Sequence, residues 1–294
     1  MNVLITGSNG FLGKKLVKIF LEKKAEVIIT TRTEQENKNA IKMDITDSEN
    51  VDAVLKEQKP RVVIHSAAIT HVDWCESNRE KTFEVNVNGT KNVALGCKKI
   101  GAKMVLISTD YVFDGEKKGK YFETDFTNPI NVYGQSKLEA EKVTSEILTD
   151  FLITRVTAIY GYNDEFDKKT FPTHIIENLS KKTELQCFVD QYLNPTLIND
   201  ISEGIFSLLK KNQKGIFHMT GRENLNRWEF AKKTAKVFSL NEKLLKQGFW
   251  KKSSFAAKRP KKLDISIEKF ENQGITMSNA EQGLLKMKKD METK

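Results

Sequence analysis

Cysteine is scarce in this sequence of 294 residues, and the three that occur lie far apart at Cys75, Cys97 and Cys187. An odd number of cysteines without metal-like spacing argues against a disulfide framework or a zinc site and is typical of a reducing compartment. Long apolar runs are also lacking, since none approaches the ~20 residues that span a bilayer. The first residues lack the basic region, apolar stretch and cleavage site of a secretory signal. We therefore expect a cytoplasmic protein without a membrane segment.

A concentrated basic patch is missing as well, although 48 Lys and Arg against 39 Asp and Glu give a net charge of +9. The excess is mostly lysine, spread along the expected helix faces without aromatic residues grouped among it. This pattern is typical of a solvated surface, whereas nucleic-acid binding calls for a concentrated basic face. We expect no nucleic-acid partner, and a small anionic substrate is compatible with the charge.

Short apolar segments alternate with helical periodicity through the first half of the chain. The helices expected between them begin after residue 10 and cover 50–58, 83–99 and 138–148. This alternation predicts an α/β fold with a Rossmann-like, doubly wound parallel sheet, which binds ligands beyond the carboxyl ends of its strands. The expected strands are Val3–Ile5, Glu26–Thr30, Arg61–His65, Met104–Ser108 and Phe151–Arg155.

The alternation weakens after Tyr160, and residues 215–219 have the pattern of one more strand returning to the sheet. We expect a nucleotide-binding domain made of residues 1–155 and a returning segment, 192–220. A small C-terminal α/β domain, made of 156–191 and 221–294, would bind the substrate.

Three glycines mark the junction between the first strand and the first helix, at Gly7, Gly10 and Gly13. The first allows a sharp turn, the second lets backbone N–H groups approach a pyrophosphate, and the third lets the helix pack close to the strand. The start of the helix also offers free N–H donors to phosphates. The sequence therefore predicts a dinucleotide site at its beginning.

A second constellation combines Thr109, at the end of an expected strand, with Tyr133 and Lys137. If the last two open a helix, their four-residue spacing places them on one face. The lysine charge would then favour tyrosinate and lower the tyrosine pKa, and the threonine hydroxyl could hold a carbonyl oxygen against the tyrosine. We interpret the three as catalytic residues.

Together these motifs resemble the extended short-chain dehydrogenases/reductases and, within them, most closely the dTDP-4-dehydrorhamnose reductases. The resemblance covers nearly the whole chain and is strongest between 60 and 140. The segments that carry it are 6–13, 66–76, Asn86, 108–115, 128–137, 190–196 and Arg259 with Pro260. It implies reduction of the 4-keto group of a deoxysugar nucleotide, with Tyr133 as proton donor and with Lys137 tuning it and binding the nicotinamide ribose. Asn86 would be a structural support.

The resemblance also implies the remaining site residues. The cofactor would contact the glycine-rich turn, the segment after the second strand, the adenine side and the end of the third strand, in order Gly7, Ser8, Asn9, Gly10, Phe11, Leu12, Gly13, Thr31, Arg32, Asp44, Ile45, Ala67 and Ala68. The substrate would contact Thr70, Val72, Thr109, Asp110 and Arg259. For Arg259, a guanidinium that holds the diphosphate and an ordinary surface arginine stay equally open.

The end of the second strand bears on the choice of cofactor. Enzymes that favour NAD place an acidic residue there, whereas this chain has Thr31 and Arg32, with no acid before Glu34. A hydroxyl and a guanidinium suit a 2′-phosphate, which predicts NADPH. If Arg32 points to solvent instead, NADH would serve as well.

Several alternatives stay open. The chain also resembles the regulatory β subunit of methionine adenosyltransferase at 215–221, which would make it a nucleotide-binding regulator. Dehydratases and epimerases share the superfamily, but Asp110 is followed by Tyr111 rather than by the second acid of a dehydratase. Ala158 stands where the rhamnose reductases have tryptophan, so another sugar is possible. We interpret His65 as a core residue and do not interpret His71 as a metal ligand. We therefore expect no metal site. A homodimer is possible.

Overall fold

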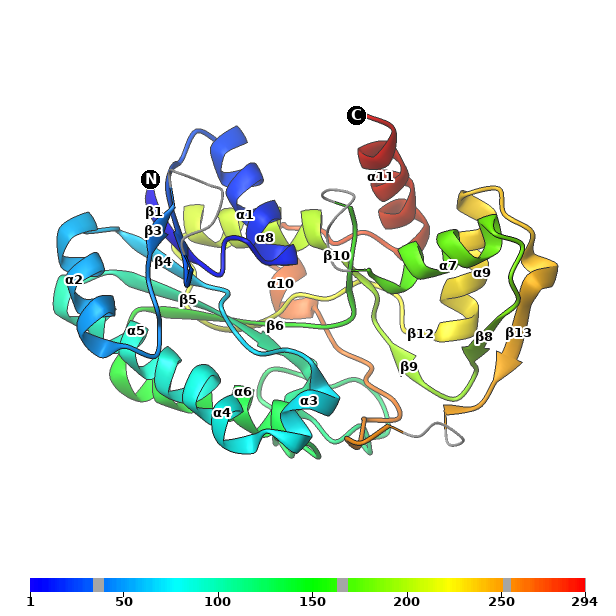
Figure 1. The fold of residues 1–294 in the computed structure, drawn as a ribbon, viewed down its shortest axis with the longest axis horizontal. Coiled ribbons are helices and arrows are strands. Elements are labelled where there is room, and N and C mark those ends of the chain that lie inside the picture. Colours follow the sequence, from blue (N-terminus) through cyan, green and yellow to red (C-terminus); the bar gives the residue numbers. More distant parts are fainter. Residues whose placement is uncertain (34–39, 163–168, 251–254, 294) are drawn as a thin grey trace.

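The computed structural model describes residues 1–33, 40–162, 169–250 and 255–293. Its centre is a seven-stranded parallel sheet in the order β11-β6-β5-β4-β1-β2-β3 (Figure 1). The strands are β1 (Asn2–Thr6), β2 (Glu26–Thr31), β3 (Ile41–Lys42), β4 (Val62–His65), β5 (Lys103–Thr109), β6 (Phe151–Val156) and β11 (Gly215–His218). The predicted Rossmann-like fold is confirmed, and the returning strand pairs with β6.

Helices cover both faces of this sheet because the strands are apolar on both sides. On one face, α1 (Phe11–Glu22) packs against α8 (Ile198–Lys210); on the other lie α2 (Ser48–Gln58), α5 (Gly89–Ile100) and α6 (Val132–Ile147). Two apolar clusters fill the layers, one around Leu16 and Phe20 and the other around Leu55 and Met104. Among the helices of the described residues, none combines the length and apolar character that crossing a bilayer requires.

A smaller group of elements lies beyond the carboxyl ends of β6 and β11 (Figure 1, right). Its helices are α7 (Phe171–Ser180), α9 (Arg227–Val237) and α11 (Ala280–Glu292), which pack around Tyr160 and Phe230. Its strands pair two by two: β7 (Ile159–Tyr160) with β10 (Thr196–Leu197), β9 (Tyr192–Leu193) with β12 (Leu225–Asn226), and β8 (Leu185–Phe188) with β13 (Leu245–Gly248). The short elements that remain are α3 (Val72–Ser77), α10 (Glu268–Glu271) and the 3₁₀ turns Asp110–Val112 and Glu242–Leu244.

The helix predicted over 83–99 is longer and irregular. It runs from α4 (Arg79–Phe83) through one π-helical turn (Glu84–Asn88) into α5. Such turns are rare and often occur at functional sites. Asn86 lies in this turn, and its amide contacts the loop after β4 and the helix α6.

Candidate active site

The glycine-rich turn lies at the carboxyl end of β1, where the first helix begins. Gly7 has φ of +65°, and a Cβ on it would lie 2.8 Å from the Ala67 backbone, so a side chain there would be strained and crowded. A Cβ on Gly13 would lie 2.1 Å from the Gly7 carbonyl oxygen, so that glycine brings α1 against the turn. Gly10 is the N-cap of α1. The turn and packing expected of Gly7 and Gly13 are therefore present.

Two cavities open along this edge of the sheet. The smaller, of about 460 Å³, is lined by the predicted cofactor residues Thr31, Arg32, Asp44, Ile45 and Ala67 together with Gly7. The larger, of about 710 Å³, is lined by Gly10, Phe11, Leu12, Thr70, Tyr133 and Lys137. Asn9 and Ala68 line both, so the cavities adjoin at the glycine-rich turn. This paired shape fits the two halves of a dinucleotide.

Other predicted residues support the site from behind rather than line it. Ser8 is buried and donates to the Thr30 carbonyl at 2.9 Å, which ties the turn to β2. Val72 begins α3 and is not among the lining residues. Thr109 ends β5 and Asp110 follows it; they are 5% and 2% exposed, and the neighbouring Ser108 lines the larger cavity.

Helix α6 carries Tyr133 and Lys137 in its first two turns. Its N-cap, Asn131, accepts a hydrogen bond from the Gly134 amide at 2.8 Å, which fixes where the helix begins. The two side chains therefore lie one turn apart on one face and both line the larger cavity, as predicted. Asn86 supports this turn, since its amide donates to the Ser136 hydroxyl at 3.0 Å.

The pKa of Tyr133 shifts opposite to our expectation. Burial raises its pKa, a hydrogen bond with Thr109 opposes the rise, and the nearby Asp110 adds to it. The expectation that the Tyr133 pKa is lowered was wrong, because loss of hydration is the largest cause of its shift and raises it. Tyr133 is thereby kept as a neutral phenol that can donate its proton.

Lys137 is 3% exposed, and burial lowers its pKa to about 8 while the Glu141 carboxylate raises it. Glu141 follows one turn later on α6 and forms a buried ion pair with Arg155, whose Nη2 lies 2.7 Å from its Oε2. The Ser108 hydroxyl also donates to Glu141. Glu141 is therefore held in place beside Lys137 by Arg155 and Ser108.

Asp110 is a buried carboxyl beside this group. Its Oδ1 accepts from the Thr109 hydroxyl at 3.2 Å, and its Oδ2 has no hydrogen-bond partner in the described residues. Burial raises the pKa of Asp110 to about 7, and the nearby hydroxyls of Thr157 and Thr109 oppose the rise. Asp110 therefore changes charge near neutral pH, in contact with the residue that touches Tyr133.

Arg259 does not reach either cavity. It forms a two-pronged ion pair with Asp73, with Nη1–Oδ1 and Nη2–Oδ2 distances of 2.9 and 2.7 Å, and stacks 4.0 Å from the Phe255 ring centroid. This pair joins the C-terminal segment to α3. Arg259 is therefore neither a free surface arginine nor exposed to the cavity. A role at the diphosphate would require that pair to open.

The histidines are structural. His65 is 1% exposed between the hydroxyls of Thr6 and Thr90, and burial lowers its pKa to about 3. His71 caps α3 by accepting from the Trp74 amide at 3.1 Å. Within the described ranges, no group of three or more His, Cys, Asp or Glu could hold a metal ion.

Sequence reasoning missed the wall contributed by the smaller group of elements. Arg227 begins α9, and Thr170 and Phe171 begin α7; all three line the larger cavity. Arg227 belongs to none of the motifs in the sequence, so nothing there singled it out. Ala158 also lines this cavity, where the relatives were expected to place tryptophan.

The comparisons agree with this geometry. Residues 1–293 match the family model described as RmlD substrate binding domain. A dTDP-4-dehydrorhamnose reductase of Aggregatibacter actinomycetemcomitans is 32% identical over 238 residues, which cover 78% of this chain and 76% of the relative. The methionine adenosyltransferase 2 subunit beta of Rattus norvegicus is 28% identical over 286 residues, covering 93% and 82%.

Solved structures give the same result. The dTDP-4-dehydrorhamnose reductase of Bacillus anthracis, solved in complex with NADP, is 30% identical with a TM-score of 0.89 over 98% of both chains. The chain is therefore similar to sugar-nucleotide reductases along almost its whole length.

Proposed function

The chain belongs to the RmlD substrate-binding-domain family, and we propose that it uses NADPH to reduce the 4-keto group of dTDP-4-dehydro-L-rhamnose to dTDP-L-rhamnose. The observation that carries the proposal is the placement of Tyr133 and Lys137 on one cavity wall, adjoining the glycine-rich turn. Residues 1–155 with 192–220 would bind the cofactor, and 156–191 with 221–294 the substrate.

Each site residue would have a distinct role in the reaction. NADPH, when bound, supplies the hydride. Tyr133, kept neutral by burial, would protonate the keto oxygen. Thr109, whose hydroxyl influences the Tyr133 pKa, would hold that oxygen, and Lys137 would bind the nicotinamide ribose and stabilise the tyrosinate that remains.

The direct test is steady-state turnover by the purified chain, with its Tyr133→Phe variant beside it. Removing the phenol hydroxyl deletes the acid and leaves the ring, so we expect turnover to fall by ~10²–10⁴-fold with NADPH binding nearly intact. Turnover is measured as NADPH oxidation in the presence of dTDP-4-dehydro-L-rhamnose. Cofactor binding is measured by fluorescence titration with NADPH. Equal turnover by both proteins would remove Tyr133 from the mechanism.

A regulatory role is the second candidate, because the alignment with the rat methionine adenosyltransferase 2 subunit beta covers 93% of this chain. A nucleotide-binding regulator would copurify with a methionine adenosyltransferase and would not turn over a keto sugar nucleotide. Affinity purification from the native source, together with the turnover assay, separates the two candidates. The same purification, analysed by light scattering, would report whether the chain forms the homodimer we keep as a proposal.

A further inference from the structure

Arg227 is a cation in the wall of the larger cavity. It is the first residue of α9, after the N-cap Asn226, whose side chain accepts from the Glu229 amide at 2.8 Å. Phe171 and Phe230 line the same cavity, as do Tyr133 and Lys137 of α6. The capped start of the helix therefore holds the arginine at a defined place.

The guanidinium is oriented but not neutralised. Its Nε donates to Gln191 Oε1 at 3.0 Å, and its plane lies over the Phe171 ring at 4.8 Å from the centroid. Among the residues that the structure describes, no carboxylate pairs with Arg227 and no acceptor is hydrogen-bonded to Nη1 or Nη2. Burial lowers the pKa of Arg227. A partly buried charge without a partner is costly unless a ligand supplies the opposite charge.

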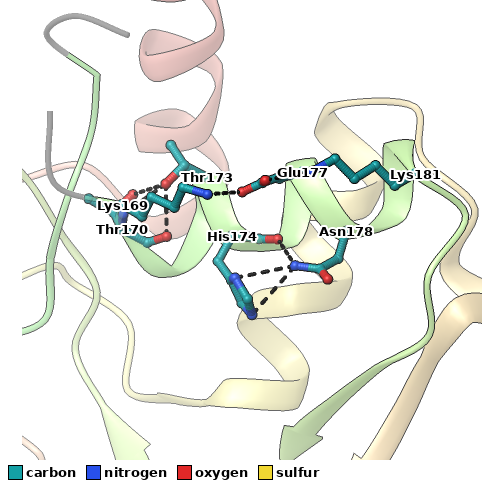
Figure 2. Close-up of polar contacts among 7 residues, drawn as sticks. All are labelled: Lys169, Thr170, Thr173, His174, Glu177, Asn178 and Lys181. Atoms are coloured by element: carbon teal, nitrogen blue, oxygen red, sulfur yellow. Dashed lines mark hydrogen bonds and ion pairs between the residues drawn. The ribbon is translucent and has the colours of Figure 1, made fainter. Parts of the chain in front are cut away.

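Two other cations are already paired with carboxylates, and Figure 2 shows one of these pairs at the start of α7. Lys169 forms an ion pair with Glu177, which also binds Lys181, and Thr170 and Thr173 form a capping box. Lys169 also lines the larger cavity, but Glu177 already neutralises its ammonium. Arg259 is paired with Asp73 in the same way.

Arg227 also lies close to the catalytic group. Burial raises the pKa of Tyr111, and the charge of Arg227 opposes that rise. The Tyr111 ring meets the Tyr133 ring edge to face, with centroids 6.0 Å apart. An anion bound to Arg227 would therefore sit near the proton donor, in the same cavity.

We propose that Arg227 is the anion anchor of the larger cavity and binds the diphosphate of the sugar nucleotide. A guanidinium whose Nε is occupied presents two parallel Nη donors, a geometry that suits two phosphate oxygens. Gln191 and Phe171 are positioning residues that fix the plane of this fork. The identity of the anion rests on the proposed function, because the diphosphate joins the reacting sugar to the nucleoside.

The test is calorimetric binding of dTDP and of thymidine to the full chain, in the wild type and in Arg227→Gln. A charge-assisted hydrogen bond is worth about 1.5–3 kcal/mol, so dTDP should bind ~10- to 100-fold more weakly to the variant. Thymidine, which has no phosphate, should bind equally to both. Arg227→Lys, which keeps the charge and loses the fork, should fall between them. Arg222→Gln is the control, since Arg222 is 48% exposed and paired with Glu271 outside the cavity.

Equal dTDP affinity in the wild type and Arg227→Gln would overturn the inference, as would an equal loss of dTDP and thymidine binding. Inorganic pyrophosphate separates this inference from the proposed function. If the chain reduces no keto sugar nucleotide but binds pyrophosphate through Arg227, the function fails and the anchor stands. If turnover occurs and Arg227→Gln keeps the wild-type KM for the sugar nucleotide, the anchor fails and the function stands.

Discussion

Asp110 is a residue whose charge depends strongly on its burial. Its pKa is raised to about 7, so between about pH 4 and 7 the folded protein binds a proton that the unfolded chain has released. The stabilisation that the protonated Asp110 carboxyl contributes to the free energy of unfolding is therefore fully present below the unfolded pKa. It is lost as pH rises through about 7. We expect Asp110→Asn, which does not titrate, to flatten this decline. Urea unfolding at about pH 5 and pH 8 measures it, and an unchanged pH dependence would contradict the assignment.

At the same scale, we expect Arg32 to decide the choice of cofactor. It lines the smaller cavity with Thr31, whose hydroxyl donates to the Thr33 carbonyl at 2.8 Å. A guanidinium–phosphate contact at an exposed site contributes ~1–2 kcal/mol, so we expect NADPH to be preferred over NADH by roughly one order of magnitude. Arg32→Ala should narrow that gap. Steady-state kinetics with both cofactors tests this, and a wild-type preference for NADH would reverse our interpretation of this strand end.

At the scale of elements, α6 presents Tyr133, Lys137 and Glu141 at four-residue intervals. Lys137 has its pKa lowered to about 8 by burial and raised by Glu141, so it loses its charge as pH rises through about 8. We expect kcat/KM to fall over that range, because the ammonium form binds the ribose and stabilises tyrosinate. Glu141→Gln should move this fall to lower pH, since the carboxylate no longer favours the ammonium.

The matched control on the same helix is Glu139→Gln, because Glu139 is 44% exposed and pairs only with Lys142 among the described residues. It should leave the pH–rate profile unchanged. If Glu141→Gln lowers activity by the same factor at every pH, Glu141 serves packing alone. Circular dichroism of both variants separates a loss of fold from a shift in the profile.

Sequence patterns predicted elements well where the signal was local. The core strands of the sheet follow from neighbouring residues, whereas α6 begins at Val132, before the predicted range 138–148. The two-residue strands β3, β7, β9, β10 and β12 carry too few residues for a periodic signal, and the π-helical turn at Asn86 depends on packing against α6. Arg227 was missed because its place in the cavity depends on the fold and not on its neighbours in sequence.

The direction of the Tyr133 pKa was missed for a similar reason. The four-residue spacing shows that Lys137 is near, but it does not show how deeply the phenol is buried. The Asp73–Arg259 pair is also invisible in the sequence, because 186 residues separate its partners. Local geometry was therefore predictable, whereas burial and long-range pairing were not.

At the scale of the whole molecule, that pair ties the C-terminal segment to α3 of the sheet layer. The pKa of Asp73 is lowered to about 2, chiefly by the hydrogen bond from Arg259, so its stabilisation is present above the unfolded pKa and is lost as pH falls toward 2. After allowance for partial exposure, the pair should contribute about 1–2 kcal/mol at neutral pH. Asp73→Asn and Arg259→Gln should each cost that much, and the double variant should cost little more than either.

Kinetic measurements on the same three variants test whether Arg259 also binds the diphosphate. If the arginine acts only through Asp73, both single variants should change the KM for the sugar nucleotide equally, because each releases the same segment. If the arginine leaves the pair to bind substrate, Arg259→Gln should raise that KM while Asp73→Asn leaves it unchanged or lowers it, since the guanidinium is then free. The KM for NADPH should stay constant in all three variants. Additive losses of unfolding free energy would show that the two side chains do not stabilise the fold as a pair.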